Sequence, residues 1–178
     1  MNLLTLIGGI SKNSASKRLF EVAKNTADSD FTFNVFDISK LPYFSQDIED
    51  NPPQTVKELK MSIEKSDAVL FVTPEYNRNI PGVLKNAVDW ASRPYGRGQW
   101  IGKPAAVIGA TISPLGALSA QMQLRSLLSF LGMFVMYHPD MYFSLKDNIG
   151  ADGKLSEHTR KAFENFFCEF KKWILKNK

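Results

Sequence analysis

Residues 66–90 read SDAVLFVTPEYNRNIPGVLKNAVDW, in which an apolar run ends in a polar turn and a helix-like segment follows. The run AVLFV has no polar alternation, which is typical of a central strand covered on both faces of a sheet. Pro81 suits the first turn of a helix, so helix initiation by itself accounts for the residues NIPG. It does not account for the residues PEYN at the end of a buried strand. We expect these four residues to form either an ordinary turn or the wall of a binding site.

The alternation of a strand with a helix continues along the whole chain. Strand-like apolar runs occupy residues 3–8, 31–38, 68–72, 104–110 and 133–137. Helix-like amphipathic segments occupy residues 16–27, 81–91, 117–132 and 156–176. Strands joined by helical crossovers lie parallel, so the pattern predicts an α/β fold with three layers, a five-stranded parallel sheet with helices on both faces. No linker divides the chain, and we predict a single domain over residues 1–178.

Two segments give further information: the last helix and the connection at residues 41–54. The last helix has an apolar stripe at spacings of three and four, which predicts packing onto the sheet rather than ligand binding. The stripe comprises Phe163, Phe166, Phe167, Phe170, Trp173 and Ile174. The segment LPYFSQDIEDNPPQ (41–54) is the most irregular stretch. Loops of this length inside a compact domain are often functional.

Composition and charge narrow the class of protein. Hydrophobic residues make up 44% of the 178 residues, but no apolar stretch approaches the roughly 20 residues of a membrane helix. The N-terminal MNLLTLIGG lacks the basic segment and cleavage site of a signal peptide, so we predict a cytoplasmic protein. The net charge of +4 is concentrated in the tail KKWILKNK, which gives little support to nucleic-acid binding.

The loop GGISKNSAS (8–16) follows the first predicted strand and opens a helix. Its glycines allow close backbone approach. The hydroxyls of Ser11, Ser14 and Ser16, together with the exposed N–H groups of a helix start, are suited to a phosphate. The alternative is that Ser or Asn only caps the helix. The loop is neither a Walker loop nor GxGxxG, so the fingerprints of ATP and dinucleotide sites are missing.

Two further loops leave the carboxyl ends of predicted strands, where ligands of open parallel sheets bind. One is TPEYNRN (73–79), which places apolar, aromatic and hydrogen-bonding groups on one rim. The other is GATISPLGALSAQ (109–121), with small residues and hydroxyls. Together with the first loop they predict a site for a mononucleotide with a planar ring. The two histidines, His138 and His158, have no ligand spacing and GxSxG is absent, so neither a metal site nor a serine hydrolase is expected.

The chain resembles the NADPH-dependent FMN reductase family, flavodoxin-like proteins that include bacterial quinone, azo-dye and chromate reductases. The most specific match is TPEYNRNIPGVLKNAVDWASRP (73–94), which is similar to a family signature of the form PEYN-x-x-x-PG-x-LKNA-x-DW. Supporting matches are GKPAAVIGAT (102–111), SPLGALSAQMQLRSLL (113–128) and DGKLSEHTRKAFENFFCEF (152–170). The resemblance covers essentially the whole chain.

The resemblance implies the flavodoxin strand order 2-1-3-4-5, FMN at the carboxyl edge of the sheet, and hydride transfer from NAD(P)H to FMN. Because the chemistry takes place on the flavin, no catalytic side chain and no metal is expected. The residues that the resemblance assigns to FMN are Ser11, Ser14 and Ser16 at the phosphate, Pro74, Glu75, Tyr76 and Asn77 along the isoalloxazine, and Ser113, Pro114, Leu115 and Gly116 on its other side.

The first loop departs from the family pattern. Where the family commonly has GS-x-R-x-x-S-x-N, this chain has Gly9, Ser11 and Ser16 at the positions of Ser, Arg and Asn. Only Ser14 keeps its residue type. The missing arginine removes a charge-assisted phosphate contact worth about 1.5–3 kcal/mol, and Lys12 or Arg18 is the expected substitute.

The electron acceptor implied by the resemblance is a quinone, an azo dye, a metal oxyanion or free flavin. Arg78, Arg93 and Arg97 are candidates for the 2′-phosphate of NADPH, and helix faces outside the core are expected to pair subunits in a homodimer or homotetramer. The alternative function is a non-enzymatic, flavodoxin-like FMN-binding or electron-transfer module. A pI near 9.1 disfavours an electron carrier that docks to basic partners.

Overall fold

A computed structural model describes residues 1–149 and 155–178 of the chain, so part of the matched segment 152–170 lies outside the described residues. The strands are β1 (Asn2–Ile7), β2 (Thr32–Phe36), β3 (Ala68–Thr73), β4 (Pro104–Thr111), β5 (Phe134–Met136) and β6 (Tyr142–Ser144). The first five form a parallel sheet in the order β2-β1-β3-β4-β5. The predicted α/β class, strand order and parallel orientation are therefore confirmed.

The sixth strand, β6, was not predicted. β5 pairs with the start of β4 and β6 pairs with its end, so the two short strands form one interrupted sheet edge. The interruption lies at residues 137–141 and contains the cis peptide bond between His138 and Pro139. A three-residue strand carries too little periodicity to be recognised from sequence.

The longer helices are α1 (Ala15–Thr26), α2 (Gln54–Lys65), α3 (Gly82–Ala91), α4 (Leu118–Phe130) and α6 (Glu157–Lys176). The shorter ones are α5 (Leu145–Asn148) and two 3-10 turns at Ile38–Lys40 and Gln46–Ile48. The helix α2 was missed in the sequence, where no helix-like segment was assigned between residues 38 and 68. Its signal was the spacing of Val56, Leu59 and Ile63, all of which are buried against the sheet.

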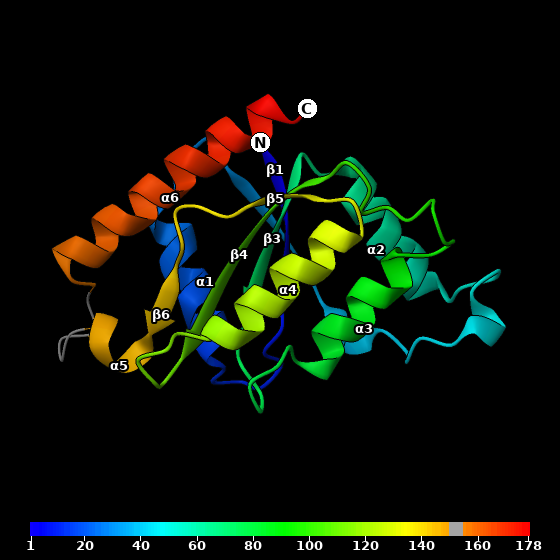
Figure 1. Cartoon of the computed structure of the whole chain (residues 1–178), viewed down its shortest axis with the longest axis horizontal. Coiled ribbons are helices and arrows are strands. Elements are labelled where there is room, and N and C mark those ends of the chain that lie inside the picture. Colours follow the sequence, from blue (N-terminus) through cyan, green and yellow to red (C-terminus); the bar gives the residue numbers. More distant parts are fainter. Residues whose placement is uncertain (150–154) are drawn as a thin grey trace.

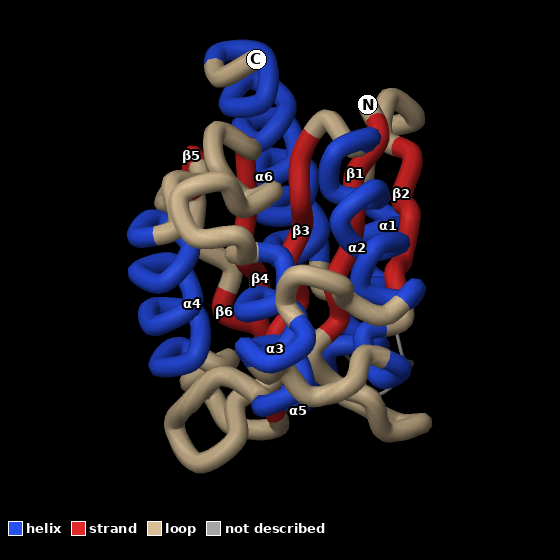
Figure 2. Tube along the Cα trace, turned by 90° about the vertical axis from the view of Figure 1, so that its right-hand side faces the viewer, coloured by secondary structure: helices blue, strands red, loops and turns tan. Residues whose placement is uncertain are grey.

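The helices cover both faces of the sheet, as Figures 1 and 2 show. On one face α1 and α6 pack against β1, β3 and β4, and the aromatic stripe of α6 is part of this core. Phe163, Phe166, Phe167 and Phe170 are almost fully buried there, so their predicted role in the core is confirmed.

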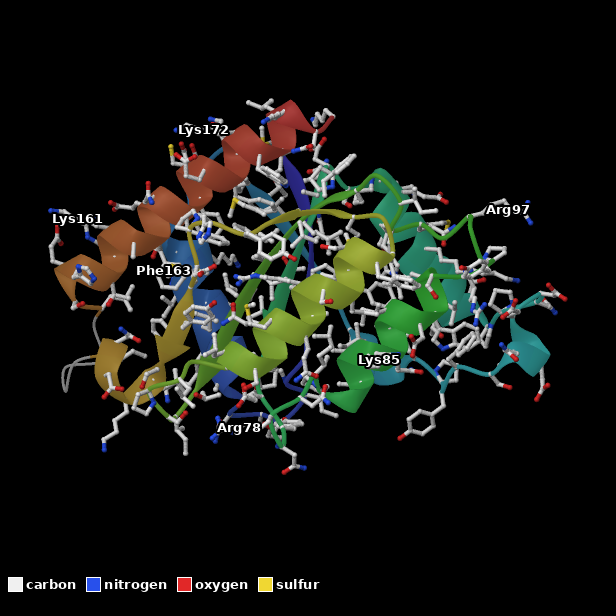
Figure 3. All side chains as sticks on the ribbon, in the orientation of Figure 1. Arg78, Lys85, Arg97, Lys161, Phe163 and Lys172 are labelled. Atoms are coloured by element: carbon white, nitrogen blue, oxygen red, sulfur yellow. The ribbon has the colours of Figure 1, made fainter. Side chains whose placement is uncertain are left out.

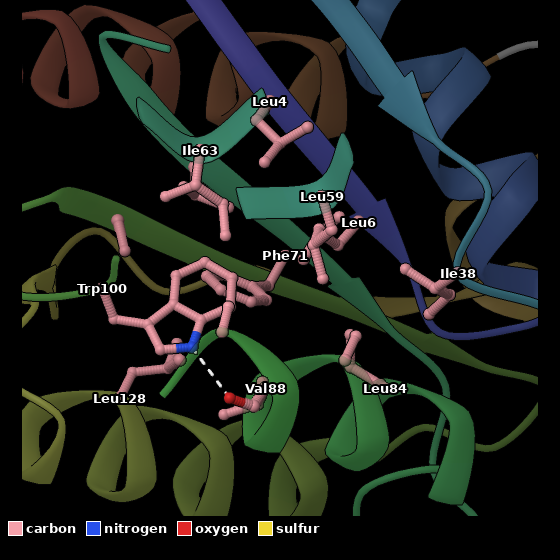
Figure 4. Close-up of a cluster of buried hydrophobic side chains, with 14 of the residues drawn as sticks. Leu4, Leu6, Ile38, Leu59, Ile63, Phe71, Leu84, Val88, Trp100 and Leu128 are labelled. Atoms are coloured by element: carbon pink, nitrogen blue, oxygen red, sulfur yellow. Dashed lines mark hydrogen bonds between the residues drawn. The ribbon is translucent and has the colours of Figure 1, made fainter. Parts of the chain in front are cut away.

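On the other face α2, α3 and α4 cover the same strands. Figure 4 shows this core, in which Trp100 lies against Phe71 and its indole N–H donates to the carbonyl of Val88 at 2.9 Å. With both faces buried, β3 is inaccessible along its whole length, which is why its sequence lacks alternation. No helix in residues 1–149 or 155–178 is long and apolar enough to cross a membrane.

The irregular segment 41–54 is held against α3 by two residues of the signature. Asn86 donates to the carbonyl of Pro42 and accepts from the N–H of Phe44. Trp90 donates to the same Pro42 carbonyl at 2.7 Å and packs edge-on against Phe44. The second half of the signature therefore has a structural role, because it fixes a loop that has almost no regular structure of its own.

Candidate functional site

The three loops singled out in the sequence all leave the carboxyl edge of the sheet from adjacent strands. The first loop follows β1, the second loop follows β3 and the third loop follows β4, and these strands are neighbours in the sheet. Parallel pairing brings their ends to the same height, with Ile7 opposite Val72 and Thr73 opposite Gly109. The topology therefore brings together at one edge all eleven residues assigned to FMN.

In the first loop, two serine hydroxyls face each other at the start of α1. The oxygens of Ser14 and Ser16 are 2.8 Å apart, and both side chains are buried, while Ser11 is exposed. A Cβ added to Gly9 would lie 1.9 Å from the Ser14 Oγ and 2.4 Å from the Ser16 Oγ, so only glycine allows the loop to close over this pair.

Ser14 occupies the N-cap position of α1, but its side chain makes no capping hydrogen bond. Within the described residues, the backbone N–H groups of Ala15, Ser16 and Lys17 also have no hydrogen-bond partner. A helix start with free N–H groups and two buried hydroxyls fits a phosphate group. The alternative of a simple serine cap is wrong for Ser14 in this structure.

The expected substitutes for the missing arginine are both exposed. Lys12 and Arg18 lie on the surface around the first loop. A third cation, Lys17, was missed in the sequence, and its ammonium group donates to the carbonyl of Ile10 at 3.0 Å. Lys17 lies in the first turn of α1, and side chains of a helix point toward its N-terminus. Lys17 is therefore the lysine that contacts the backbone of the loop, at Ile10.

The second loop is a tight hairpin turn. Tyr76 and Asn79 exchange backbone hydrogen bonds at 3.1 and 3.0 Å, and the two residues between them have positive φ angles, 51° at Asn77 and 63° at Arg78. This conformation is that of a type I′ turn. It leaves Tyr76 51% exposed on the rim, while Pro74 at the base of the turn is buried.

Glu75 connects the second loop to α4. One oxygen of its carboxylate accepts from the backbone N–H of Ala120 at 3.2 Å, and the other pairs with Arg78 at 3.3 Å. Its side chain is only 8% exposed. A carboxylate at a helix N-terminus is favourable to the helix dipole, so Glu75 holds the hairpin against α4. Gln123 adds a second connection by donating to the carbonyl of Arg78 at 2.7 Å.

The third loop closes by local hydrogen bonds and then turns sharply into α4. Ser113 donates its N–H to Thr111 Oγ1 at 3.2 Å, and Gly116 donates its N–H to the carbonyl of Ser113 at 3.3 Å. Gly116 and Ala117 both have positive φ, 51° and 62°. Leu115 is 44% exposed, so this loop presents an apolar side chain and backbone groups at the rim.

Only one of the three candidate arginines for the 2′-phosphate lies at this edge. Arg78 is in the second loop, whereas Arg93 and Arg97 follow the end of α3. Figure 3 shows Arg97 well away from Arg78. Arg93 is paired with Glu49 at 3.6 Å and lies over the ring of Phe44. α3 carries the chain of Arg93 and Arg97 away from the three loops, and a role of any of the three arginines at the 2′-phosphate stays a prediction.

Comparison with solved structures defines the class of fold. Among solved structures, a flavodoxin variant from Pseudomonas aeruginosa superposes with a TM-score of 0.60 at 20% identity over 98% of this chain and 99% of that chain. The fold is therefore flavodoxin-like. The flavoenzyme NAD(P)H:(acceptor) oxidoreductase FerB from Paracoccus denitrificans superposes with a TM-score of 0.92 at 39% identity, covering 99% and 98% of the two chains.

The family profile for NADPH-dependent FMN reductase matches residues 1–147. A 2-hydroxy-1,4-benzoquinone reductase from a Burkholderia species is 39% identical over 176 residues, which are 98% of this chain and 96% of that protein. A quinone reductase from Pseudomonas putida is 37% identical over 179 residues, 99% and 96% of the two proteins. The chain belongs to the NADPH-dependent FMN reductase family. It is an NAD(P)H-dependent oxidoreductase with FMN as its cofactor, as the sequence predicted.

Proposed function

We propose that the protein reduces quinones, with NAD(P)H as the electron donor and FMN held between the three loops. The observation that carries the choice of acceptor is that relatives covering nearly the whole chain are named quinone reductases. FMN held there would supply the redox chemistry: a hydride taken from NAD(P)H and passed on, together with one proton from solvent, would convert a quinone to a hydroquinone. Azo dyes, metal oxyanions and free flavin are the other acceptors that we predicted.

The three loops have different roles in this proposal. The start of α1, with Ser14 and Lys17, receives the phosphate of FMN. Tyr76 and Leu115, exposed on facing loops, enclose the isoalloxazine and leave one face open to nicotinamide and then to a quinone. Glu75 keeps the second loop at a constant distance from α4 and so sets the width of the ring site.

The test of the proposed function is anaerobic. We expect the FMN-loaded protein to lose its flavin absorbance at once on mixing with NADPH, and a benzoquinone added afterwards to restore it with one hydroquinone formed per NADPH. Absence of bleaching would favour the non-enzymatic carrier or binding module. Rapid bleaching followed by slow reoxidation with benzoquinone but fast reoxidation with an azo dye, chromate or free flavin would reassign the acceptor.

We also propose that two copies of the chain associate through the outer face of α4. That helix has a single charged residue, Arg125, which is buried, while Met122 is 49% and Phe130 is 77% exposed. Alongside it lies a largely apolar hollow of about 570 Å³ between α3, α4 and the loop after α3. Lys85 and Asp89, one turn apart on α3, border this hollow and pair with each other at 2.7 Å, so their charges are already balanced within one copy.

Sedimentation velocity tests this association. We expect the wild-type chain to sediment as a dimer or tetramer, and a Met122→Glu, Phe130→Glu double variant to shift to the monomer. A monomeric wild type would contradict the proposal.

The cytoplasmic location and the single-domain organisation over residues 1–178 stay predictions.

A further inference from the structure

A pocket of about 280 Å³ lies beside the first loop, on the side of β2. Its lining comes from Ile10 and Lys17 on one side and from residues 35–39, at the end of β2 and just after it, on the other. Because β2 and β3 flank β1 on opposite sides, this pocket is separated from the second and third loops. We call it the β2 pocket, and none of the eleven residues assigned to FMN lines it.

Two aliphatic side chains form walls of the β2 pocket. Ile10 is 50% exposed and Val35 is 52% exposed, although residues of this kind are mostly buried in folded proteins. Sites for small molecules hold their ligands mainly by apolar contacts, and their volumes run from about 300 to 1,000 Å³. The β2 pocket is therefore suited to one end of a ligand, such as a planar base, rather than to a whole cofactor.

Asp37 places a fixed carboxylate in the β2 pocket. One of its oxygens accepts from the N–H and the hydroxyl of Ser39, at 3.1 and 2.6 Å. The other oxygen has Lys40 at 3.5 Å, and the side chain is 56% exposed, so this oxygen is accessible to a ligand. The hydrogen bond from the Ser39 hydroxyl lowers the pKa of Asp37 below its ordinary value near 3.8, and the group is a charged acceptor at neutral pH.

Positive charge lies between the β2 pocket and the first loop. The ammonium group of Lys17 lines the pocket and donates to the carbonyl of Ile10 at 3.0 Å, and Lys12 is exposed on the same loop. The pocket thus combines apolar walls, an acceptor for hydroxyl groups and a cation toward the loop. Adenosine joined to a diphosphate carries the complementary groups, which are a planar base, ribose hydroxyls and an anion.

We propose that the β2 pocket binds the adenosine half of the nicotinamide dinucleotide, with the base between Ile10 and Val35 and a ribose hydroxyl donating to Asp37. This inference rests on the proposed function, in which the nicotinamide lies against the flavin. The diphosphate crosses the first loop and so connects the two sites. By analogy, other dinucleotide-binding folds with parallel sheets also use an acidic side chain to accept from the ribose.

The experiment follows flavin reduction in the FMN-loaded protein by anaerobic stopped flow. NADH is compared with reduced nicotinamide mononucleotide, which lacks the adenosine half. Val35→Trp fills the pocket with a side chain that strands accommodate well. We expect it to raise the dissociation constant of NADH about tenfold, and to leave the affinity for the mononucleotide and both limiting rates of reduction unchanged.

Asp37→Asn is the second variant, because asparagine still caps the 3-10 turn but carries no charge. It should raise the dissociation constant of NADH about threefold, again without an effect on the mononucleotide. If Val35→Trp does not fold, Asp37→Asn is judged by the same criteria.

Thr32→Trp and Asp47→Asn are the matched controls. Thr32 is exposed on the same strand but outside the pocket, and Asp47 is an exposed carboxylate in another 3-10 turn. Both variants should bind NADH like wild type. An unchanged NADH affinity in Val35→Trp and Asp37→Asn, or an equal change with NADH and the mononucleotide, would overturn the inference.

Binding of AMP gives a readout that does not depend on the redox reaction. AMP added to the FMN-loaded protein should shift the amide NMR signals of Ile10, Val35 and Asp37, and these shifts should disappear in Val35→Trp. Shifts confined to the second loop would place the adenosine near Arg78 and overturn the inference, as would the absence of any shift.

The mononucleotide separates this inference from the proposed function. A wild-type flavin that is reduced by neither NADH nor the mononucleotide would contradict the proposed function itself. Reduction by both, with variants that bind NADH like wild type, would overturn the adenosine site alone.

Discussion

Ser14 is the residue at which the phosphate site is most directly testable. Its hydroxyl is paired with Ser16 and does not cap α1, so Ser14→Asp adds a carboxylate next to the expected phosphate while providing a good capping residue. Loss of the hydroxyl and repulsion between like charges at an effective dielectric near 20 should cost on the order of several kcal/mol, about a hundredfold or more in FMN affinity. Titration of the apo protein with FMN, followed by flavin fluorescence, measures this change in affinity.

Riboflavin is the control for Ser14→Asp, because it has the ring without the phosphate. Its affinity should change far less than that of FMN, and the melting temperature should stay close to that of wild type. A variant that binds FMN as tightly as wild type would move the phosphate site away from Ser14.

Tyr76 is half exposed and bonded to the hairpin only through its backbone, so its ring is free to contact a ligand. We expect Tyr76→Ala to weaken FMN binding or slow quinone reduction while changing the free energy of unfolding of the apo protein by less than about 0.5 kcal/mol. Thermal denaturation and flavin titration distinguish the two effects. A large loss of stability with unchanged flavin affinity would mean that the ring belongs to the core.

At the scale of elements, the contact between the second loop and α4 depends on one carboxylate. Glu75→Ala removes the acceptor of the Ala120 N–H and the partner of Arg78, so the apo protein should lose about 1–2 kcal/mol of unfolding free energy. Glu75→Gln keeps an acceptor without the charge and should lose about half as much. Urea unfolding measures both changes.

Glu64→Ala is the control for Glu75, since Glu64 is an exposed carboxylate on α2 whose side chain has no partner within the described residues. It should unfold like wild type. Equal stability of Glu75→Ala and Glu64→Ala would show that the hairpin is held by Gln123 and by backbone hydrogen bonds alone.

At the scale of the whole molecule, Asp67 joins the two ends of the chain to the start of β3. Its carboxylate pairs with Lys178 at 2.7 Å and accepts from the N–H of Asn2 at 2.8 Å. The hydrogen bond from Lys178 and that from Asn2 lower the pKa of Asp67 below its ordinary value near 3.8. The carboxylate therefore stabilises the fold fully above about pH 4, and this stabilisation is lost as the pH falls through the lowered pKa.

We expect Asp67→Asn to reduce the unfolding free energy by roughly 1 kcal/mol near neutral pH, since the pair is partly exposed. The difference from wild type should shrink as the pH falls below about 4, because the wild-type carboxyl is then protonated as well. Urea unfolding at a series of pH values measures this difference. A gap that stays constant down to about pH 2 would contradict the assignment.

The sequence by itself determined the class of fold, the strand order through the family resemblance, and the three loops that meet at the carboxyl edge as the candidate site. It did so because continuous apolar runs such as AVLFV identify central strands, and because ligands of parallel sheets bind beyond their carboxyl ends. The helix α2 was missed, although the spacing of its apolar residues Val56, Leu59 and Ile63 carried the signal. The edge strand β6 carried no such signal, because three residues show no period.

Only the tertiary structure decided what individual polar side chains do. Ser14 and Glu75 are polar residues in loops, and their sequence positions alone do not distinguish a ligand contact from a contact to another element. The fold brings Glu75 to Ala120 on α4, which lies 45 residues further along the chain. It also buries Gln121 behind the third loop, where its amide donates to Met141, 20 residues further along. Hydrogen bonds between such distant residues depend on how the helices pack on the sheet, and no local pattern encodes them.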